Sequence, residues 1–346
     1  MSRKSEVRVL ERPPREALRA GDFFSEPAPI SDPLLPSRSP PRAPEGRVHS
    51  MDSMTAVDGH GLRLIVFLQG CSKRCVFCCN PDSWSPSAGR WVTVGDVRRA
   101  LAKNLAYYRR SGGGVTLSGG ECLLQPEFCR AVCVMAHRLG VTAAIDTAAA
   151  GVETQWRRLL PEVDVALVCV KSADPEKHAR ITQAHDQRPH RVLMAFLRAC
   201  EDHGVKVWIR HVLMEARVEE GVEEEDERAR EGTRRSVGSG TNRDEFESES
   251  ESADEEGTRS RRAETRLDVF RRLATDGDED VDGVARVVHA HANIAGVELL
   301  PYHRFGEYKW REMGLAYPLR GMKTPSKETI ERVKARFEAR GVTVIL

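Results

Sequence analysis

The chain has 346 residues, enough for one barrel-sized domain or two smaller ones, and a formal net charge of +1. A charge so close to zero gives no electrostatic reason to expect a nucleic-acid partner, and the apolar runs are too short to span a bilayer, so we expect no membrane partner either. The nine cysteines are an odd number, and the chain carries no clear secretory signal, which favours a reducing compartment over a disulfide framework.

Residues 1–46 are rich in Pro, Arg, Ser and Glu, and we predict that they are disordered. Such a composition cannot bury enough apolar surface to offset the entropy of ordering the chain. The arginines and serines are also typical of a transit peptide, but Glu6, Glu11 and Glu16 argue against one, because transit peptides are poor in acidic residues. We therefore expect a cytoplasmic protein, with an organelle as the location that a transit peptide would imply.

Beyond residue 46 the sequence predicts strands and helices in alternation. The predicted strands cover residues 62–68, 114–117, 141–145, 163–170, 205–214 and 296–300, and the predicted helices cover residues 93–108, 126–139, 191–203, 265–274, 281–292 and 327–340. Strands that alternate with helices pair in parallel through right-handed crossovers. The fold class is therefore α/β, and a partial (β/α)6 TIM-like barrel over residues 47–346 accounts for about six such units.

An acidic, low-complexity segment at residues 217–264 interrupts this pattern after the fifth predicted strand. Its glutamate-rich runs predict disorder for the same entropic reason. The loop lies on the face where the strands end. We interpret it as a tolerated loop expansion, and the alternative is a tether or gate for a partner protein.

Three cysteines, Cys71, Cys75 and Cys78, follow the first predicted strand at Cys-x3-Cys-x2-Cys spacing. Three thiolates on one loop can hold three corners of an iron–sulfur cube, and a cube without a fourth cysteine leaves one iron open. Zinc sites usually show paired knuckles with two further ligands, and no second pair follows here. Another kind of metal site and plain buried thiols remain as alternatives. Cys79 adjoins Cys78 too closely to count as a further cluster ligand.

A glycine-rich run brackets the second predicted strand and ends in Gly119, Gly120 and Glu121. Paired glycines let the backbone approach a ligand closely, and Glu121 can accept a hydrogen bond from a ligand ammonium group. A glycine-rich turn without a ligand is the alternative. Because active sites of such barrels lie at the carboxyl ends of the strands, this run and the cysteine loop are predicted to share one face.

The cysteine triplet, with Phe77 before its last member, and Gly119-Gly120-Glu121 together resemble the signature of radical S-adenosylmethionine enzymes. Other runs resemble more closely the pyruvate formate-lyase activating family. They are residues 49–50, 55–59, 67–70, 111–121, 207–210, 298–303, 309–310, 313–314 and 325–334. The resemblance covers residues 47–215 and 265–346. The sequence between Cys78 and Gly112 lacks the cysteine-rich insert of relatives that activate other glycyl radical enzymes, which favours the formate-lyase type.

The resemblance implies a mechanism and its cofactors. Cys71, Cys75 and Cys78 would hold a 4Fe–4S cluster whose open iron binds S-adenosylmethionine. One electron, from a donor such as flavodoxin or ferredoxin, would cleave the sulfonium to methionine and a 5′-deoxyadenosyl radical. That radical would take a hydrogen atom from a glycine of pyruvate formate-lyase, the protein substrate. We expect the activating chain to be a monomer.

The resemblance also implies roles for further residues. Phe77 and Cys79 would flank the adenine, and Gly119 with Gly120 would meet the methionine end of the cofactor. The rest of the implied cofactor-binding set is Glu121, Cys169, Val170, Lys171, Arg210 and His303. Asp146 and Thr147 would bind a monovalent cation beside the cofactor carboxylate.

Four departures from the family pattern stand out. Gly59-His60-Gly61 replaces Gly-Pro-Gly, Cys79 replaces a histidine, Ala148 and Ala149 replace the residues after Asp-Thr, and Cys169 replaces an aspartate. A neutral thiol is a poor ligand for a hard cation, which prefers oxygen, so cation activation is expected to be weakened. Two alternatives follow: an activase of another glycyl radical enzyme, and a catalytically impaired paralogue that acts as a binding scaffold.

Overall fold

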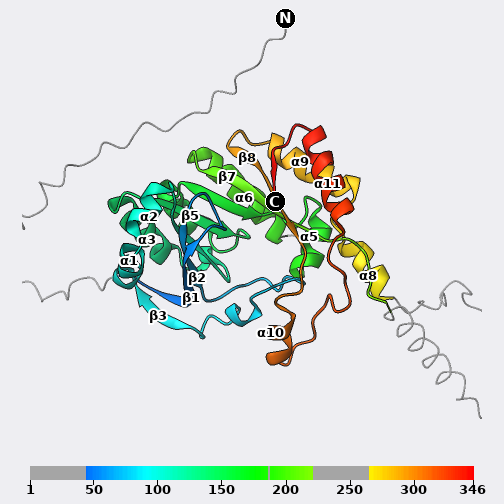
Figure 1. Cartoon of the computed structure of the whole chain (residues 1–346), viewed down its shortest axis with the longest axis horizontal. Coiled ribbons are helices and arrows are strands. Elements are labelled where there is room, and N and C mark those ends of the chain that lie inside the picture. The colour runs from blue at the N-terminus through cyan, green and yellow to red at the C-terminus, as the bar shows by residue number, and fades with distance from the viewer. Residues whose placement is uncertain (1–43, 186–187, 221–264) are drawn as a thin grey trace, which may run out of the picture. The chain divides into compact units, whose positions relative to one another are not determined.

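The structure, a computed structural model, describes residues 44–185, 188–220 and 265–346. Its described strands form one sheet in the order β3-β1-β2-β4-β5-β6-β7-β8-β9 (Figure 1). The strands are β1 (Glu45–Thr55), β2 (Arg63–Leu68), β3 (Arg90–Thr93), β4 (Gly114–Gly119), β5 (Thr142–Thr147), β6 (Val165–Cys169), β7 (Lys206–Leu213), β8 (Ile294–Pro301) and β9 (Val344–Ile345). From β2 to β9 every neighbouring pair is parallel. The run β2-β4-β5-β6-β7-β8 confirms the partial (β/α)6 arrangement.

Helices connect these parallel strands and cover the sheet. They are α1 (Val94–Ala102), α2 (Leu105–Arg110), α3 (Pro126–Arg138), α4 (Glu153–Leu159), α5 (Pro175–Thr182), α6 (Arg188–Asp202), α8 (Arg266–Leu273), α9 (Asp278–His289), α10 (Glu307–Glu312) and α11 (Lys327–Ala339), with short 3-10 turns at Pro81–Ser83, Cys122–Leu124 and Leu160–Glu162. Figure 1 shows α1, α2 and α3 beside the first parallel strands and α9 and α11 beside the last. None of the described helices is long and apolar enough to cross a membrane.

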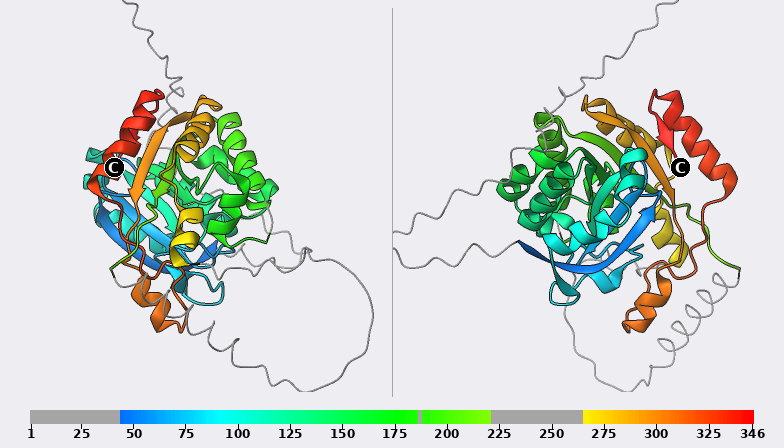
Figure 2. Two further views of the ribbon diagram at one scale, coloured as in Figure 1. Left: turned by 90° about the vertical axis from the view of Figure 1, so that its right-hand side faces the viewer. Right: turned by 60° about the vertical axis from the view of Figure 1, so that its left-hand side comes forward.

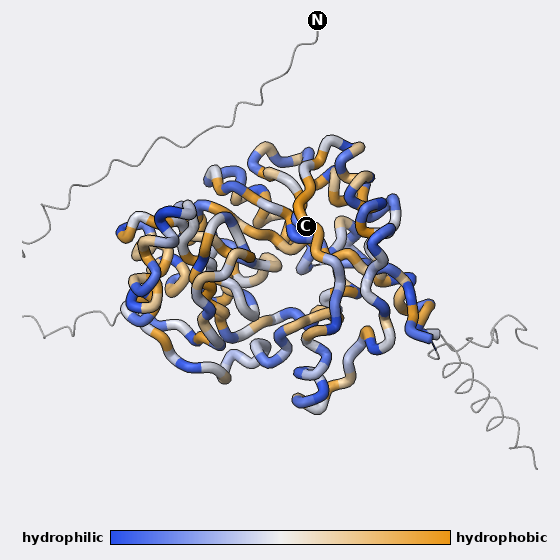
Figure 3. Tube along the Cα trace, viewed as in Figure 1, coloured by the Kyte–Doolittle hydropathy of each residue, from blue (hydrophilic) through white to orange (hydrophobic). Residues whose placement is uncertain are grey.

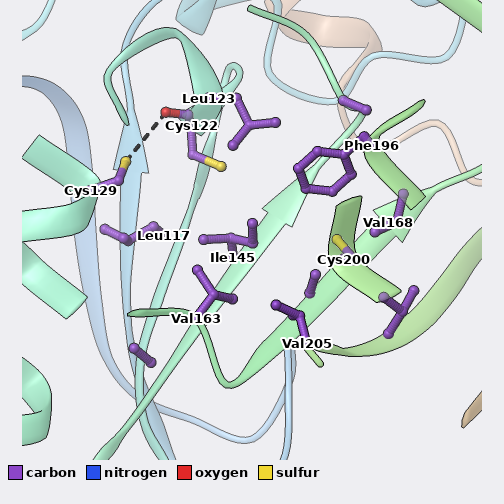
Figure 4. Close-up of a cluster of buried hydrophobic side chains, with 14 of the residues drawn as sticks. Leu117, Cys122, Leu123, Cys129, Ile145, Val163, Val168, Phe196, Cys200 and Val205 are labelled. Carbon is purple, nitrogen blue, oxygen red and sulfur yellow. Dashed lines mark hydrogen bonds between the residues drawn. The ribbon is translucent and has the colours of Figure 1, made fainter. Parts of the chain in front are cut away.

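The parallel strands from β2 to β8 are rich in apolar residues, as expected for strands whose two faces are both covered. In β2 the run from Leu64 to Val66 is almost entirely buried, as is typical of a central parallel strand. Figure 3 shows apolar residues along the central strands and polar residues recurring along the outer helices. Figure 4 shows the layer between them, where Leu117, Ile145 and Val168 from three strands meet Phe196 of α6. The packing of apolar helix faces onto this sheet therefore fixes where the strands end.

Three thiols lie in this core, those of Cys122, Cys129 and Cys133. All three are free and fully buried. The Cys129 Sγ donates to the carbonyl oxygen of Cys122 over 3.3 Å, as Figure 4 shows. They serve as small apolar side chains.

The structure differs from the predicted elements in two places at the start of the chain. Residues 93–108 form two helices, because the backbone of Asn104 (φ −123°) leaves the helical range between α1 and α2. Strand β1 begins at Glu45, inside the segment 1–46 for which disorder is predicted, and pairs antiparallel with β2 and β3. Residues 1–43 lie outside the described residues.

The predicted acidic insert also begins later than expected. Residues 217–220 belong to the folded part, since Val218 forms an antiparallel bridge with Met322 and the Glu219 amide donates to the carbonyl of Gly321. The remaining residues, 221–264, lie outside the described residues. The insert therefore leaves the fold from a point that is held against the segment preceding α11.

Candidate active site

A cavity of about 520 Å³ opens at the carboxyl ends of the parallel strands. It brings together nearly all of the predicted site residues. Those that line it are Cys71, Cys75, Phe77, Cys78, Cys79, Gly119, Gly120, Asp146, Thr147, Cys169, Lys171, Arg210 and His303. The end of each parallel strand from β2 to β8 contributes, so the rule that parallel-strand enzymes place chemistry at this face holds here.

The end of α5 holds the backbone of the cysteine loop in place. The amides of Arg74 and Val76 donate to the carbonyls of Thr182 and Ile181 at the end of that helix, over 3.2 and 3.0 Å. Val76 and Phe77 are buried in a second apolar cluster with Ile181. The loop therefore has a fixed backbone that does not depend on its thiols for support.

The segment that follows β8 clamps the other end of this loop. In both views of Figure 2 the part carrying α10 extends away from the helices that cover the sheet. The indole Nε1 of Trp310 donates to the carbonyl of Cys78 over 2.8 Å, and the ring of Trp310 packs edge-on against Trp84. The Lys309 Nζ lies 3.0 Å from Asp82 Oδ2. A Cβ on Gly306 would lie 2.4 Å from the Cα of Cys79, so only glycine fits this contact.

Gly119 and Gly120 join the end of β4 to the cysteine loop. The Gly120 amide donates to the carbonyl of Leu68, and the Glu121 amide donates to that of Gly70, over 2.8 and 2.9 Å. Gly119 has φ +108°, and a Cβ there would lie 2.1 Å from the amide nitrogen of Leu68. The glycines thus let two backbones meet beside the cavity.

Glu121 and Val170 differ from the expectation for them, because neither lines the cavity. Glu121 is buried, and its carboxylate accepts hydrogen bonds from the Thr147 hydroxyl and the amides of Leu123 and Ala148. It therefore ties the end of β4 to that of β5 rather than facing a ligand. Val170 is fully buried, and its amide donates to the carbonyl of Arg210.

Arg210, on β7, is the residue that the acidic side chains of the site contact in common. It forms ion pairs with Asp58, Asp146 and Glu298 at 2.6, 3.1 and 2.8 Å. Burial alone would lower the pKa of this guanidinium, but the three neighbouring carboxylates raise it well above its ordinary value. Burial raises the pKa of Asp58 despite its contact with Arg210. The site thus holds a permanently charged cation at its centre.

Cys169 and Lys171 lie at the end of β6 as a hydrogen-bonded pair. Burial raises the pKa of the Cys169 thiol, so it is neutral. The Lys171 Nζ lies 4.9 Å from the centre of the Phe77 ring, within cation–π range. Burial opposes the charge on Lys171, but its pKa is raised overall through its contacts with Cys169 and Cys75 and the nearby carboxylate of Asp146. A positive side chain therefore faces the space beside the cysteine loop.

The three thiols fit an iron–sulfur cluster by the chemistry of their donor set. They come from one rigid loop and border one cavity, and burial raises the pKa of Cys71 and of Cys78 to about 12. Cluster binding would therefore displace protons from them. Among the described residues no group of three or more His, Cys, Asp or Glu side chains converges on a single ion. A cube presents separate iron atoms, so its cysteines need not meet at one point.

The predicted cation ligands are already engaged by protein groups. Asp146 Oδ2 accepts from Arg210 and, over 2.7 Å, from the hydroxyl of Ser118, while the Thr147 hydroxyl donates to Glu121. Asp146 Oδ1 is buried without a hydrogen-bond partner among the described residues. One such oxygen beside a thiol is a poor donor set for a hard cation, and the cation stays a prediction.

Sequence reasoning assigned no role to several residues that line the cavity. They are Asp58, Lys73, Asn80, Trp84, Ser118 and Tyr302. The sequence signal for Lys73 is its position between the motif cysteines Cys71 and Cys75. Burial lowers the pKa of its side chain. Asp58 comes from the loop after β1, a strand that the sequence did not predict.

Comparisons with known proteins agree with this site. A family model described as a 4Fe-4S single cluster domain matches residues 57–188. The chain is 32% identical to the pyruvate formate-lyase-activating enzyme of Clostridium pasteurianum, over 84% of this chain and 95% of that one. It is also 32% identical to the pyruvate formate-lyase 1-activating enzyme of Escherichia coli K12, over 87% of this chain and 98% of that one.

A solved structure, a domain of the pyruvate-formate lyase-activating enzyme of Bacteroides vulgatus, is similar with a TM-score of 0.41 at 17% identity, over 67% of this chain and 98% of that one. The sequence relatives are aligned over almost their whole length, and the match of the cluster domain includes all three motif cysteines. The chain therefore belongs to the pyruvate formate-lyase-activating enzyme family of radical S-adenosylmethionine enzymes.

Proposed function

We propose that this chain activates a pyruvate formate-lyase by generating a glycyl radical on it. The observation that carries the proposal is the cysteine loop, which lies at the strand ends beside Gly119 and Gly120 and borders a cavity of about 520 Å³. The names of the curated relatives support pyruvate formate-lyase as the protein substrate.

Cys71, Cys75 and Cys78 hold the 4Fe–4S cluster in this proposal. When bound, the cluster supplies the electron that cleaves S-adenosylmethionine and so makes hydrogen abstraction from a partner's glycine feasible. The protein positions the cofactor. Phe77 and Cys79 face the cavity from the same loop as the cluster ligands, and His303 faces it from the segment after β8.

Charged residues of the cavity orient the cofactor. The Lys171 ammonium suits the cofactor carboxylate. The unpartnered Asp146 Oδ1 can accept from the cofactor amino group. Arg210 holds Asp146 in place through its ion pair. Arg210 therefore positions the Asp146 carboxylate, and its own contact with the cofactor is secondary. An electron donor such as flavodoxin or ferredoxin, a monomeric state and a cytoplasmic location complete the proposal.

The test is anaerobic reconstitution of the full chain with iron and sulfide, followed by addition of S-adenosylmethionine and a strong reductant. We expect 5′-deoxyadenosine from the wild-type chain and none from Cys75→Ala. Mixing the loaded chain with a pyruvate formate-lyase should then give a glycyl radical signal by electron paramagnetic resonance.

Each other outcome points to a different function. Cleavage without a radical on pyruvate formate-lyase, but with one on a dehydratase or decarboxylase of the glycyl radical class, would reassign the partner. A fully loaded cluster that forms no 5′-deoxyadenosine would mean that the replacements at Ala148, Ala149 and Cys169 have abolished the chemistry. The chain would then be a scaffold.

A further inference from the structure

Lys73 is a buried cation that the function proposed above leaves without a role. It lies between Cys71 and Cys75 in the cysteine loop, its side chain lines the cavity, and the residue is only 5% exposed. Its Nζ has no hydrogen-bond partner among the described residues. A buried ammonium without an acceptor is costly, so a partner that the protein chain does not itself supply must account for it.

The described protein groups near Lys73 do not supply a hydrogen-bond acceptor for its ammonium. Glu121 is an acidic side chain that acts on Lys73, but its carboxylate is engaged by Thr147, Leu123 and Ala148 and makes no ion pair with Lys73 in the described part of the chain. Other groups that act on Lys73 are the thiols of Cys71 and Cys75, the ammonium of Lys171 and the buried ring of His178. None of these groups forms a hydrogen bond with the Lys73 ammonium in the described part of the chain.

Hydrogen bonds of the loop backbone also fix where the Lys73 residue lies. The Lys73 amide donates to Cys71 Sγ over 3.4 Å, so this residue already contacts one motif thiol. The amides of Arg74 and Val76 are tied to the end of α5. A residue between two ligands on a loop this rigid stays beside whatever those two thiols hold.

We propose that Lys73 donates a hydrogen bond to the sulfur atoms of the bound 4Fe–4S cluster and raises its reduction potential. This inference rests on the proposed function, since it needs the cluster. Hydrogen bonds to the sulfurs and the net charge nearby are the main protein controls on cluster potential. Reduction adds a negative charge, which a buried ammonium at the sulfurs stabilises. Lys73 is thus a tuning residue that eases electron transfer from the donor.

The experiment is a redox titration of the reconstituted full chain without S-adenosylmethionine, followed by electron paramagnetic resonance. We expect Lys73→Met to shift the midpoint to a more negative potential. At a fixed poise the ratio of reduced to oxidised cluster should fall at least about tenfold, a shift of about 59 mV for a one-electron couple. Lys73→Arg, which keeps a cationic donor, should stay near the wild type. Only loaded molecules give the signal, so partial loading does not move the midpoint.

Arg74→Met is the matched control. It removes a neighbouring positive charge from the same loop, but the Arg74 residue is exposed and stacks on the ring of Trp84 at 4.7 Å. Because exposed charges are screened by solvent, we expect a much smaller shift. If Lys73→Met fails to load, Lys73→Gln, which keeps an uncharged donor, is titrated in its place and should give an intermediate midpoint.

A Lys73→Met or Lys73→Gln midpoint equal to that of the wild type would overturn the inference and leave the proposed function standing. If S-adenosylmethionine also bound more weakly to that variant, Lys73 would be a cofactor ligand instead. A wild-type chain that takes up no cluster at all would instead reject the proposed function.

Discussion

Arg210 holds three partly buried acidic side chains of the site together, and its removal tests how much they depend on it. The Arg210 residue is only 8% exposed, and it pairs with Asp58, Asp146 and Glu298. Arg210→Met would leave these partly buried carboxylates without a counter-charge. We expect a loss of about 3–5 kcal/mol in the free energy of unfolding, measured with urea at pH 7.

Arg157→Met serves as the control for Arg210. Arg157 pairs with Glu153 and Asp202 on the surface, where solvent screens the charges. We expect it to cost far less than Arg210→Met. Equal losses for the two variants would contradict the role given to the buried cation.

His178 predicts how stability depends on pH. Its ring is fully buried, and burial, together with the nearby charge of Lys73, lowers its pKa to about 3. In the unfolded chain a histidine takes up a proton below about pH 6.5. The unfolded state therefore binds more protons between those values, and stability falls as the pH falls through that range.

His178→Met removes this contribution to the pH dependence of stability. We expect the loss of unfolding free energy between pH 7 and pH 5 to be smaller in that variant by up to about 2 kcal/mol. His289→Gln, at an exposed position of α9, is the control and should follow the wild type. A His178→Met variant that is as acid-sensitive as the wild type would refute the assignment.

At the residue scale the sequence predicted those cavity residues whose type and motif alone indicate their chemistry. The motif cysteines, the paired glycines and Lys171 all meet at one cavity. Glu121 was misplaced because its partner, the Thr147 hydroxyl, lies 26 residues away on another strand. Lys73 was missed because burial without a partner is a property of the folded chain only. Asp58 was missed because its partner, Arg210, lies far away in the sequence on another strand.

At the scale of elements, the six parallel strands were predicted because each is a short apolar run that is buried on both faces. Strand β1 was missed because it is a half-exposed strand with register shifts against β2, so its polar residues show no clean alternation. Helices α5 and α10 were missed because they are short and rich in charge. Both elements hold the cysteine loop, so the support of the site was less predictable than the site itself.

The clamp formed by the segment around α10 can be tested at Gly306. A Cβ there would lie 2.4 Å from Cys79 Cα and 2.8 Å from its carbonyl oxygen, and neither backbone can move freely. We expect Gly306→Ala to push α10 away, lowering the free energy of unfolding by about 1–3 kcal/mol. Because Trp310 would lose its hydrogen bond to Cys78, the variant should also retain less iron after dialysis.

Gly95→Ala is the matched control for Gly306→Ala. Gly95 lies in α1, and a Cβ there would come no closer than 3.5 Å to Thr93, an ordinary contact. Alanine is favoured over glycine in a helix by about 0.5–1 kcal/mol, so we expect a small gain in stability and unchanged iron retention. Iron retention by Gly306→Ala equal to that of Gly95→Ala would argue that α10 does not support the loop.

At the scale of the whole molecule, the acidic insert tests whether the folded part is sufficient for function. Residues 217–220 belong to the fold, through the bridge from Val218 to Met322, so a deletion that includes them would damage the segment before α11. Replacing only residues 221–264 with a flexible Gly-Ser linker of about twenty residues keeps that bridge, and longer surface loops cost little closure entropy. We expect unchanged formation of 5′-deoxyadenosine and unchanged radical formation on the partner. Loss of both would mean that the insert supports the fold. Intact cofactor cleavage with failed activation of the partner would make the acidic segment a docking element, because its charge would then matter only in the encounter between the two proteins.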